Sequence, residues 1–220
     1  MSSSTSIDFD KLRAAMVIGQ LIPRNISDKA VLEAFRKVPR HEFVPQVLRQ
    51  SAYNDYPLPI GENQTISQPY MVALMTECLK LKGAEKILEV GTGSGYQAAI
   101  LGEIAGEVYS VERFKDLADK ASKVLSSLGY KNIHIKVGDG TLGWSDFAPY
   151  DGIVVTAGAP TIPESLVKQL KDGGSLVIPV DRGGFGQTLT LVERIGRTTR
   201  ASDICACAFV PLVGREGWPE

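Results

Sequence analysis

A glycine-rich loop and three acidic residues are the parts of this sequence best suited to chemistry. The stretch ILEVGTGSGYQAA, residues 87–99, places three glycines between an apolar run and a run that is typical of a helix. Glu89, Glu112 and Asp139 each lie at or just after the end of an apolar run. Ligands of open α/β sheets bind at the carboxyl ends of the strands. The spacing therefore predicts a small-molecule site at one edge of a sheet.

Three kinds of ligand suit a glycine loop, and the neighbouring residues distinguish them. A nucleoside-triphosphate loop has a lysine after its last glycine, whereas Tyr96 follows Gly95 here. A dinucleotide loop has its third glycine at the position of Tyr96, and Glu89 would repel a pyrophosphate. S-adenosylmethionine (SAM) has no phosphate, and its amino group and sulfonium can face a carboxylate. The residues therefore favour SAM.

Each part of SAM has a candidate partner in this set. Glu89 would face the cationic part, Glu112 would accept hydrogen bonds from two ribose hydroxyls, and Asp139 would accept one from the adenine amino group. Two alternatives stay open, because Asp139-Gly140 can be a turn and Ser94 can cap the following helix. Glycine has no Cβ, so backbone N–H groups of the loop can approach the ligand; the remaining predicted cofactor residues are Gly91, Thr92, Gly93, Ser94, Gly95 and Gly140.

Strands and helices alternate around these residues. The patterns predict strands at 86–90, 107–112, 133–138, 150–156 and 175–180, and helices at 94–104, 115–128 and 163–170. Such alternation indicates βαβ units and a parallel sheet. Two more strands, at 189–195 and 206–213, have no clear helix between them and indicate a terminal antiparallel pair. Helices at 8–20, 27–37 and from 70 onward flank a loop-rich region at 38–69.

The predicted fold class is α/β, a Rossmann-like, doubly wound, mostly parallel sheet of the SAM-dependent methyltransferase kind. With 220 residues and 44% hydrophobic content, the chain suits a single domain. Its predicted parts are an N-terminal helical and substrate-loop region (1–82), a SAM-binding core (83–180) and a C-terminal strand pair (181–220).

Composition disfavours several classes of partner. The net charge of −1 gives no basic field for nucleic acid. No apolar run reaches the roughly 18 residues of a membrane span, and the polar start lacks the pattern of a signal peptide, so we expect a soluble, cytoplasmic protein. Three cysteines and two histidines without a cluster predict neither a disulfide framework nor a metal site.

Several motifs resemble the protein-L-isoaspartate (D-aspartate) O-methyltransferase family over most of the chain. The combination of QTISQP with VPLVG is the specific part of the resemblance. The matching stretches are VPRHEFVP (38–45), QTISQPYMVALM (64–75), LEVGTGSGYQAA (88–99), VGDG (137–140), PYDGIVVTAGAP (149–160), LKDGGSLVIPV (170–180) and FVPLVG (209–214).

The resemblance implies a reaction and a second set of site residues. It implies methyl transfer from SAM to the free α-carboxylate of L-isoaspartyl, and possibly D-aspartyl, residues of damaged proteins and peptides, with S-adenosylhomocysteine as product. The methyl ester then recyclises to succinimide, which begins repair. Ser67 corresponds to the catalytic serine of the family. The implied substrate-binding residues are Thr65, Ile66, Val210, Pro211 and Leu212.

Other functions compete with this one. A SAM-dependent methyltransferase can act on a small molecule or on RNA, although RNA binding would call for a basic, aromatic face. A nicotinamide-dependent oxidoreductase is opposed by Glu89 and by the displaced third glycine. A binding module that keeps the fold would bind SAM without turnover. The sequence leaves the choice between monomer and homo-oligomer undecided.

Overall fold

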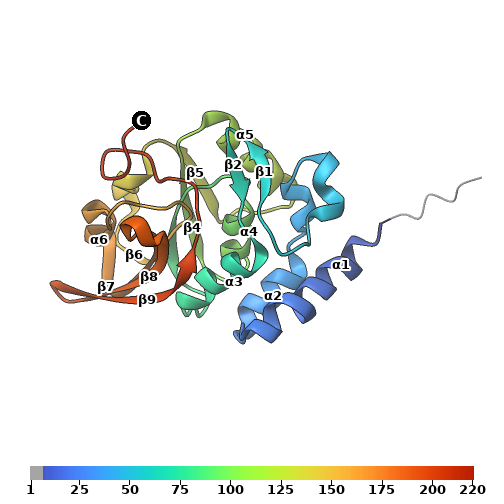
Figure 1. Ribbon diagram of the computed structural model, residues 1–220, viewed down its shortest axis with the longest axis horizontal. Coiled ribbons are helices and arrows are strands. Elements are labelled where there is room, and N and C mark those ends of the chain that lie inside the picture. The colour runs from blue at the N-terminus through green and yellow to red at the C-terminus, as the bar shows by residue number, and fades with distance from the viewer. Residues whose placement is uncertain (1–6) are drawn as a thin grey trace, which may run out of the picture.

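A seven-stranded sheet forms the centre of the computed structural model, which describes residues 7–220 (Figure 1). The strand order is β5-β4-β3-β6-β7-β8-β9. Pairing is parallel from β5 to β7, and β8 and β9 are antiparallel additions. This topology confirms the predicted mostly parallel sheet with antiparallel C-terminal strands. The strands are β3 (Lys86–Val90), β4 (Glu107–Glu112), β5 (Ile133–Val137), β6 (Tyr150–Val155), β7 (Leu170–Asp181), β8 (Gln187–Ile195) and β9 (Thr198–Cys207).

The parallel strands form where apolar residues are continuous, because both faces of the sheet are covered. In β3, Ile87 packs toward one face, whereas Leu88 and Val90 pack toward the other. Helices α4 (Tyr96–Gly102), α5 (Lys115–Ser127) and α6 (Glu164–Gln169) connect successive strands. The chain passes from β3 to β4 on one side and then returns to β6 on the other, so β3 and β6 flank the topological switch point.

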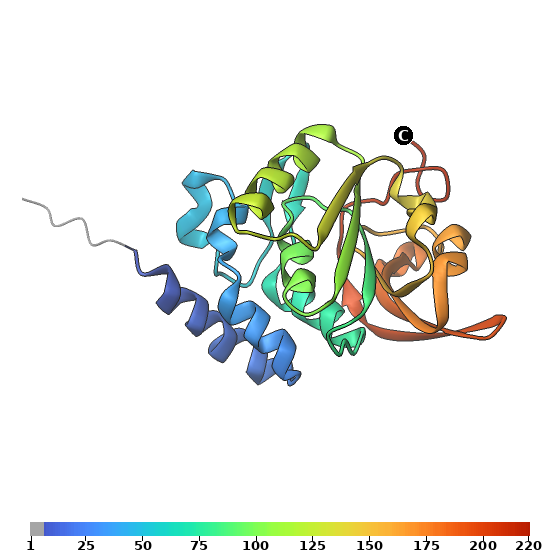
Figure 2. The same cartoon turned by 180° about the vertical axis from the view of Figure 1, so that it is seen from behind.

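The two faces of the sheet carry different layers. The first face packs against the N-terminal helices, α4 and α5 in one large apolar cluster, and Figure 2 shows α5 and the N-terminal helices on the same side of the strands. The second face packs against α6 and an aromatic group of Tyr109, Trp144, Phe147 and Tyr150. The core therefore consists of two clusters separated by the sheet.

The N-terminal region is helical, as predicted, and it contains one element that the sequence did not indicate. Asp28 caps α2 (Lys29–Lys37) by accepting the N–H groups of Ala30 and Val31, and α1 (Phe9–Met16) continues as a π-helical turn (Val17–Leu21). Within the loop-rich region, β1 (Leu58–Gly61) and β2 (Gln64–Ile66) form a hairpin that leads into α3 (Pro69–Cys78). This hairpin places the QTIS stretch beside the carboxyl edge of the main sheet.

The last predicted strand, at 206–213, was placed wrongly. The chain turns at Gly196, where φ is +61°, and returns as β9 over Thr198–Cys207. Most of β9 is exposed and polar, because it is the outer strand of the sheet, so it lacks the alternating apolar pattern used for the prediction. The β8–β9 hairpin extends beyond the rest of the sheet in Figure 1. Residues 208–213 instead run along the carboxyl edge of the sheet.

The predicted division into regions 1–82, 83–180 and 181–220 stays a prediction. Its first six residues lie outside those that the structure describes. No helix among residues 7–220 has the length and apolar character needed to cross a membrane.

Candidate functional site

A cavity of about 280 Å³ lies at the carboxyl ends of β3, β4 and β6. Three parts of the chain that are far apart in sequence form its walls. They are the β1–β2 hairpin, the glycine loop together with the ends of β4 and β6, and the segment that follows β9. The cavity is lined by residues 62–67, 90–94, 111–114 and 210–213, and by Val72, Tyr96, Gln97, Gly140, Thr156 and Ala157. Its position at the switch point is that of ligand sites in open α/β sheets.

The structure brings together most of the residues predicted from the sequence. The ones that line the cavity are Thr65, Ile66, Ser67, Gly91, Thr92, Gly93, Ser94, Glu112, Gly140, Val210, Pro211 and Leu212. Three do not line it: Glu89 is fully buried below the loop, Gly95 begins α4 against α5, and Asp139 lies under the C-terminal segment. The cofactor roles of all these residues remain predictions.

The glycine loop depends on backbone conformations that only glycine adopts easily. Gly91, Gly93 and Gly95 have φ of +95°, +53° and +89°, which favours residues without a Cβ. Thr156 at the end of β6 donates its hydroxyl to the Gly91 carbonyl (2.6 Å). A Cβ at Gly91 would overlap that hydroxyl oxygen. The loop is therefore closed by a side chain from the neighbouring strand.

Gly91→Ala is expected to weaken cofactor binding at least tenfold and to lower stability by about 1–3 kcal/mol. The change adds a strained backbone conformation and displaces the Thr156 hydroxyl. Calorimetric titration with S-adenosylhomocysteine and urea denaturation would measure the two effects. Gly129→Ala is a matched control, because Gly129 also has a positive φ (+87°) but no heavy atom within 4 Å of its would-be Cβ. Equal losses of ligand affinity in both variants would contradict this account.

Glu112 is the acid that the structure places best for a ligand. Its carboxylate lines the cavity although its residue is only 5% exposed. It accepts the N–H groups of Gly93 (2.7 Å) and Phe114 (3.0 Å), one on each oxygen. A carboxylate has about four acceptor positions, so two stay free for hydroxyl donors. The geometry therefore suits a ribose, and it also explains how Glu112 shapes the loop.

Glu89 has a different environment from the one expected. Its carboxylate is fully buried and accepts the Ser110 hydroxyl, which in turn lies 2.5 Å from the Thr92 hydroxyl. Its other oxygen has no hydrogen-bond partner among residues 7–220. Burial raises the pKa of the Glu89 carboxyl from 4.5 to about 8, which outweighs the opposing effect of the Ser110 hydrogen bond. Glu89 therefore reaches the cavity only through Ser110 and Thr92.

The raised pKa makes stability depend on pH. The folded state holds the Glu89 proton more tightly than the unfolded chain, so this stabilisation is fully present below about pH 4.5 and is lost as pH rises through 8. We expect Glu89→Gln to remove this decline, because glutamine does not titrate. Urea denaturation of both chains at about pH 5 and about pH 8.5 would test it. Asp139 and Asp151 have lowered pKa values and titrate below this window. An identical pH dependence in both chains would refute the role of Glu89.

Asp139 holds the C-terminal segment. One carboxylate oxygen accepts the N–H (2.9 Å) and hydroxyl (2.7 Å) of Thr141, and the other accepts the Arg215 N–H (2.8 Å). These bonds and the nearby Arg113 charge keep the Asp139 pKa below its ordinary value, against the effect of burial. The open alternative of a turn thus matches the local structure, because Asp139 caps the turn Gly140–Leu142. Its predicted contact with adenine stays a prediction.

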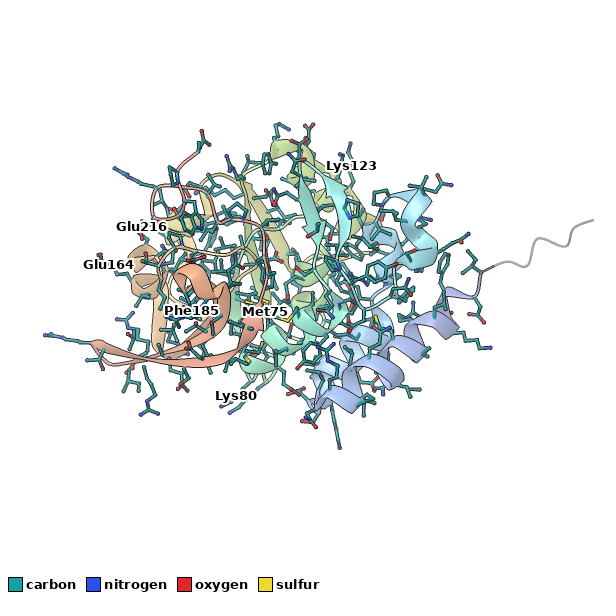
Figure 3. All side chains as sticks on the ribbon, in the orientation of Figure 1. Met75, Lys80, Lys123, Glu164, Phe185 and Glu216 are labelled. Carbon is teal, nitrogen blue, oxygen red and sulfur yellow. The ribbon has the colours of Figure 1, made fainter. Side chains whose placement is uncertain are left out.

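A second contact fixes the same C-terminal segment. Glu216 accepts the N–H and the hydroxyl of Ser165 near the start of α6 (2.9 and 2.5 Å), and Figure 3 shows Glu216 close to Glu164.

Ser94 is the other residue for which the sequence left an alternative open, and its hydroxyl accepts the Tyr96 N–H at 3.3 Å at the beginning of α4. Its hydroxyl therefore contributes to the helix start as well as to the cavity wall.

Ser67 lies in the wall opposite the glycine loop. Its hydroxyl makes no hydrogen bond within residues 7–220, whereas its carbonyl accepts Nη2 of Arg40 (2.7 Å). The Arg40 Nε donates to the Ala52 carbonyl (2.7 Å), and the guanidinium lies 4.7 Å from the Tyr96 ring centroid. Arg40 is fully buried, and burial lowers its pKa to about 10. It therefore stays charged near neutral pH and holds the Ser67 backbone.

Sequence reasoning missed Arg40, Thr156 and Phe114. Thr156 had a signal, because it is a polar residue that ends an apolar strand at the predicted ligand edge. Phe114 follows the ligand-facing acid Glu112 by two residues. Arg40 had only its place in the VPRHEFVP motif, since its contact with Ser67 spans 27 positions.

The lining of the cavity offers groups that suit SAM. Gly91 and Gly140 allow close packing beside the cavity, since a Cβ would lie 2.4 Å from Thr156 Oγ1 at Gly91 and 2.6 Å from Val90 Cγ1 at Gly140. Glu112 supplies a carboxylate for hydroxyl groups, and the charged residues of the lining are Glu62, Glu112 and Arg113. Within the described part of the chain, no group of three or more His, Cys, Asp or Glu side chains could hold a metal ion.

Comparison with known proteins gives a consistent result. Residues 13–217 match the family model of protein-L-isoaspartate(D-aspartate) O-methyltransferase. The protein-L-isoaspartate O-methyltransferase 1 of Syntrophobacter fumaroxidans is 56% identical and covers 96% of this chain and 99% of its own length. A protein-L-isoaspartate O-methyltransferase 2 of Marinobacter nauticus is 53% identical, covering 96% of this chain and 97% of its own.

Solved structures support the same fold. A protein-L-isoaspartate O-methyltransferase superposes with a TM-score of 0.83 at 28% identity, covering 94% of this chain and 67% of the other. A Plasmodium falciparum structure described as a putative protein of this kind, in complex with S-adenosyl-L-homocysteine, gives 0.77 at 23% identity, covering 93% and 98%. The SAM-methyltransferase fold is thereby confirmed. The family model and the near-full-length relatives also confirm the resemblance found in the motifs, and the chain belongs to the protein-L-isoaspartate (D-aspartate) O-methyltransferase family.

Proposed function

We propose that this chain transfers a methyl group from S-adenosylmethionine to the free α-carboxylate of L-isoaspartyl residues in damaged proteins and peptides. The observation that carries the proposal is the single cavity in which the glycine loop, Ser67 and residues 210–212 meet. One wall suits the methyl donor and the opposite walls suit an acceptor. The reaction begins repair, because the methyl ester recyclises to succinimide.

The cofactor side of the cavity would bind and orient the donor. When bound, S-adenosylmethionine supplies an electrophilic methyl group on a sulfonium, and transfer to a carboxylate oxygen leaves S-adenosylhomocysteine. Glu112 would accept the ribose hydroxyls, and the backbone of residues 91–94 would surround the rest of the ligand. Glu89 would act on the cationic part indirectly, through the Ser110 and Thr92 hydroxyls.

The acceptor side needs no general base. A carboxylate is already ionised near neutral pH, so the site has to orient an oxygen toward the methyl group. The Ser67 hydroxyl would donate to the oxygen that does not attack. Arg40 holds the Ser67 carbonyl, and its buried positive charge favours an anionic acceptor nearby. Thr65, Ile66 and residues 210–212 would contact the peptide around the isoaspartyl residue.

Methyl transfer from labelled SAM to two matched peptides tests the function. One peptide carries L-isoaspartate and the other carries normal aspartate at the same position. We expect base-labile label only in the isoaspartyl peptide. Binding of S-adenosylhomocysteine without transfer to either peptide would reject the proposed acceptor, and assays with small molecules and RNA would then follow.

A further inference from the structure

The segment that forms one wall of the cavity leaves the sheet before it reaches the cavity. β9 ends at Cys207, whereas the wall begins at Val210. Gly158 anchors the far part of the segment, because its N–H donates to Val210 O (2.7 Å) and its carbonyl accepts the Leu212 N–H (2.8 Å). Phe209 lies between the end of the strand and this anchor. What holds Phe209 therefore decides where the wall begins.

The side-chain amide of Gln187 holds Phe209 at both backbone groups. Its Oε1 accepts the Phe209 N–H (2.7 Å), and its Nε2 donates to the Phe209 carbonyl (3.0 Å). Gln187 begins β8, where its backbone pairs with Asp181 of β7 and with Cys207 of β9. A strand residue would make the same two bonds with a neighbour. The amide thus extends the ladder beyond the end of β9.

Gly158 makes room for this amide. It is buried, and a Cβ built on it would overlap the carboxamide of Gln187. Its φ is not in the left-handed region, so alanine suits its backbone, and the three atoms nearest to the added Cβ all belong to Gln187. The two residues therefore act as a pair on one segment, Gln187 at Phe209 and Gly158 at Val210 and Leu212.

Different bonds hold the cofactor side of the cavity. Glu112 accepts the Gly93 N–H, and Thr156 donates to the Gly91 carbonyl. The hydrogen bonds of the Gln187 side chain within residues 7–220 go to Phe209 alone. Loss of the amide would therefore release one wall and leave the glycine loop in place.

We propose that Gln187 is a positioning residue for the acceptor peptide, which it serves by holding residues 209–212 as a fixed wall. This inference rests on the proposed function, because the acceptor role of residues 210–212 is part of it. A peptide whose neighbouring side chains vary is recognised best through main-chain groups along a fixed edge. A wall that moves weakens peptide binding more than it slows methyl transfer.

The experiment compares Gln187→Ala, Gly158→Ala and the double variant with the wild-type chain. Gln187→Ala is expected to raise KM for the isoaspartyl peptide roughly tenfold through loss of two hydrogen bonds. The dissociation constant of S-adenosylhomocysteine should stay within about twofold. Gly158→Ala should raise KM in the same direction by displacing the amide. The double variant should match Gln187→Ala, because the overlap disappears with the side chain.

Gln169→Ala is the matched control. Its amide makes the same kind of clamp, accepting the Trp144 N–H (2.9 Å) and donating to Leu142 O (2.8 Å), and it also lies against a glycine, Gly143. The Gln169 amide holds the turn at residues 142–144, which do not line the cavity. KM for the peptide should therefore stay within about twofold of the wild-type value. Amide hydrogen exchange at Phe209 should become faster only in the Gln187 and Gly158 variants.

Each outcome decides the question. An unchanged peptide KM in the Gln187 variant of an active enzyme would overturn the inference. Equal increases in the peptide KM and in the S-adenosylhomocysteine dissociation constant, with unchanged Phe209 exchange, would show a general structural role and would also overturn it. A wild-type chain that binds S-adenosylhomocysteine but methylates no isoaspartyl peptide would overturn the proposed function, and the acceptor role of Gln187 with it.

Discussion

Ser67→Ala is expected to lower kcat for the isoaspartyl peptide on the order of a hundredfold while leaving affinity for S-adenosylhomocysteine unchanged. The reason is the loss of a hydrogen-bond donor that orients the acceptor carboxylate, an effect of the size seen when one such donor is removed from an active site. The Ser67 hydroxyl lies in the cavity wall without a partner in residues 7–220, so it is available for a ligand. Steady-state kinetics with the matched peptides and calorimetric titration would measure both quantities.

Ser94→Ala provides the comparison for that result. Its hydroxyl lines the same cavity but lies on the cofactor side and supports the start of α4. We expect its effect to fall on cofactor affinity rather than on kcat. If Ser67→Ala weakened S-adenosylhomocysteine and left turnover of the bound complex intact, the role assigned to Ser67 would be wrong.

Glu112→Ala is expected to weaken cofactor binding by about 2–4 kcal/mol, which is roughly 30- to 1000-fold in dissociation constant. The change removes a charged acceptor for the ribose hydroxyls. It also releases the Gly93 and Phe114 N–H groups that the carboxylate now holds, so the loop loses part of its shape. Calorimetric titration with S-adenosylhomocysteine would give the constant directly.

Glu107→Ala is the control at the opposite end of the same strand. Glu107 is exposed at the start of β4 and pairs with His134 (2.8 Å), so we expect no change in cofactor affinity. Glu112→Gln should lie between alanine and wild type, because the amide keeps one acceptor oxygen but loses the charge. An unchanged dissociation constant in Glu112→Ala would remove this residue from the site.

The centre of the fold was predictable because local pattern and tertiary environment agree there. The apolar runs that form β3, β4 and β6 are continuous since both faces of the sheet are covered. The start of α2 was predictable for a local reason, because Ser27 and Asp28 are both residues that cap helices, and the Asp28 side chain accepts N–H groups two and three residues later. Glu112 also lies where strand spacing placed it, at the cavity.

The structure was less predictable where the local sequence pattern does not show how a segment pairs or how deeply a side chain is buried. β9 pairs with β8 along one edge, and most of its side chains face water. Its sequence therefore has no alternating apolar pattern from which a strand could be predicted. The β1–β2 hairpin is short, and Glu62 and Asn63, both with positive φ, form its turn. The structure buries the Glu89 carboxylate and leaves it out of the cavity lining, and the predicted role of Glu89 toward the cationic part of the ligand stays a prediction.

One wall of the cavity comes from a segment that lies far along the chain from the strands of the cofactor side. Residues 86–155 supply β3 to β6 and the glycine loop, whereas the opposite wall includes residues 210–213 and is secured through Arg215 and Glu216. During synthesis on the ribosome, residues 62–67 and 86–155 are therefore made before residues 210–213, so this wall of the cavity is the last to be added. A chain that lacks residues 208–213 would therefore have a cavity that is open on this side.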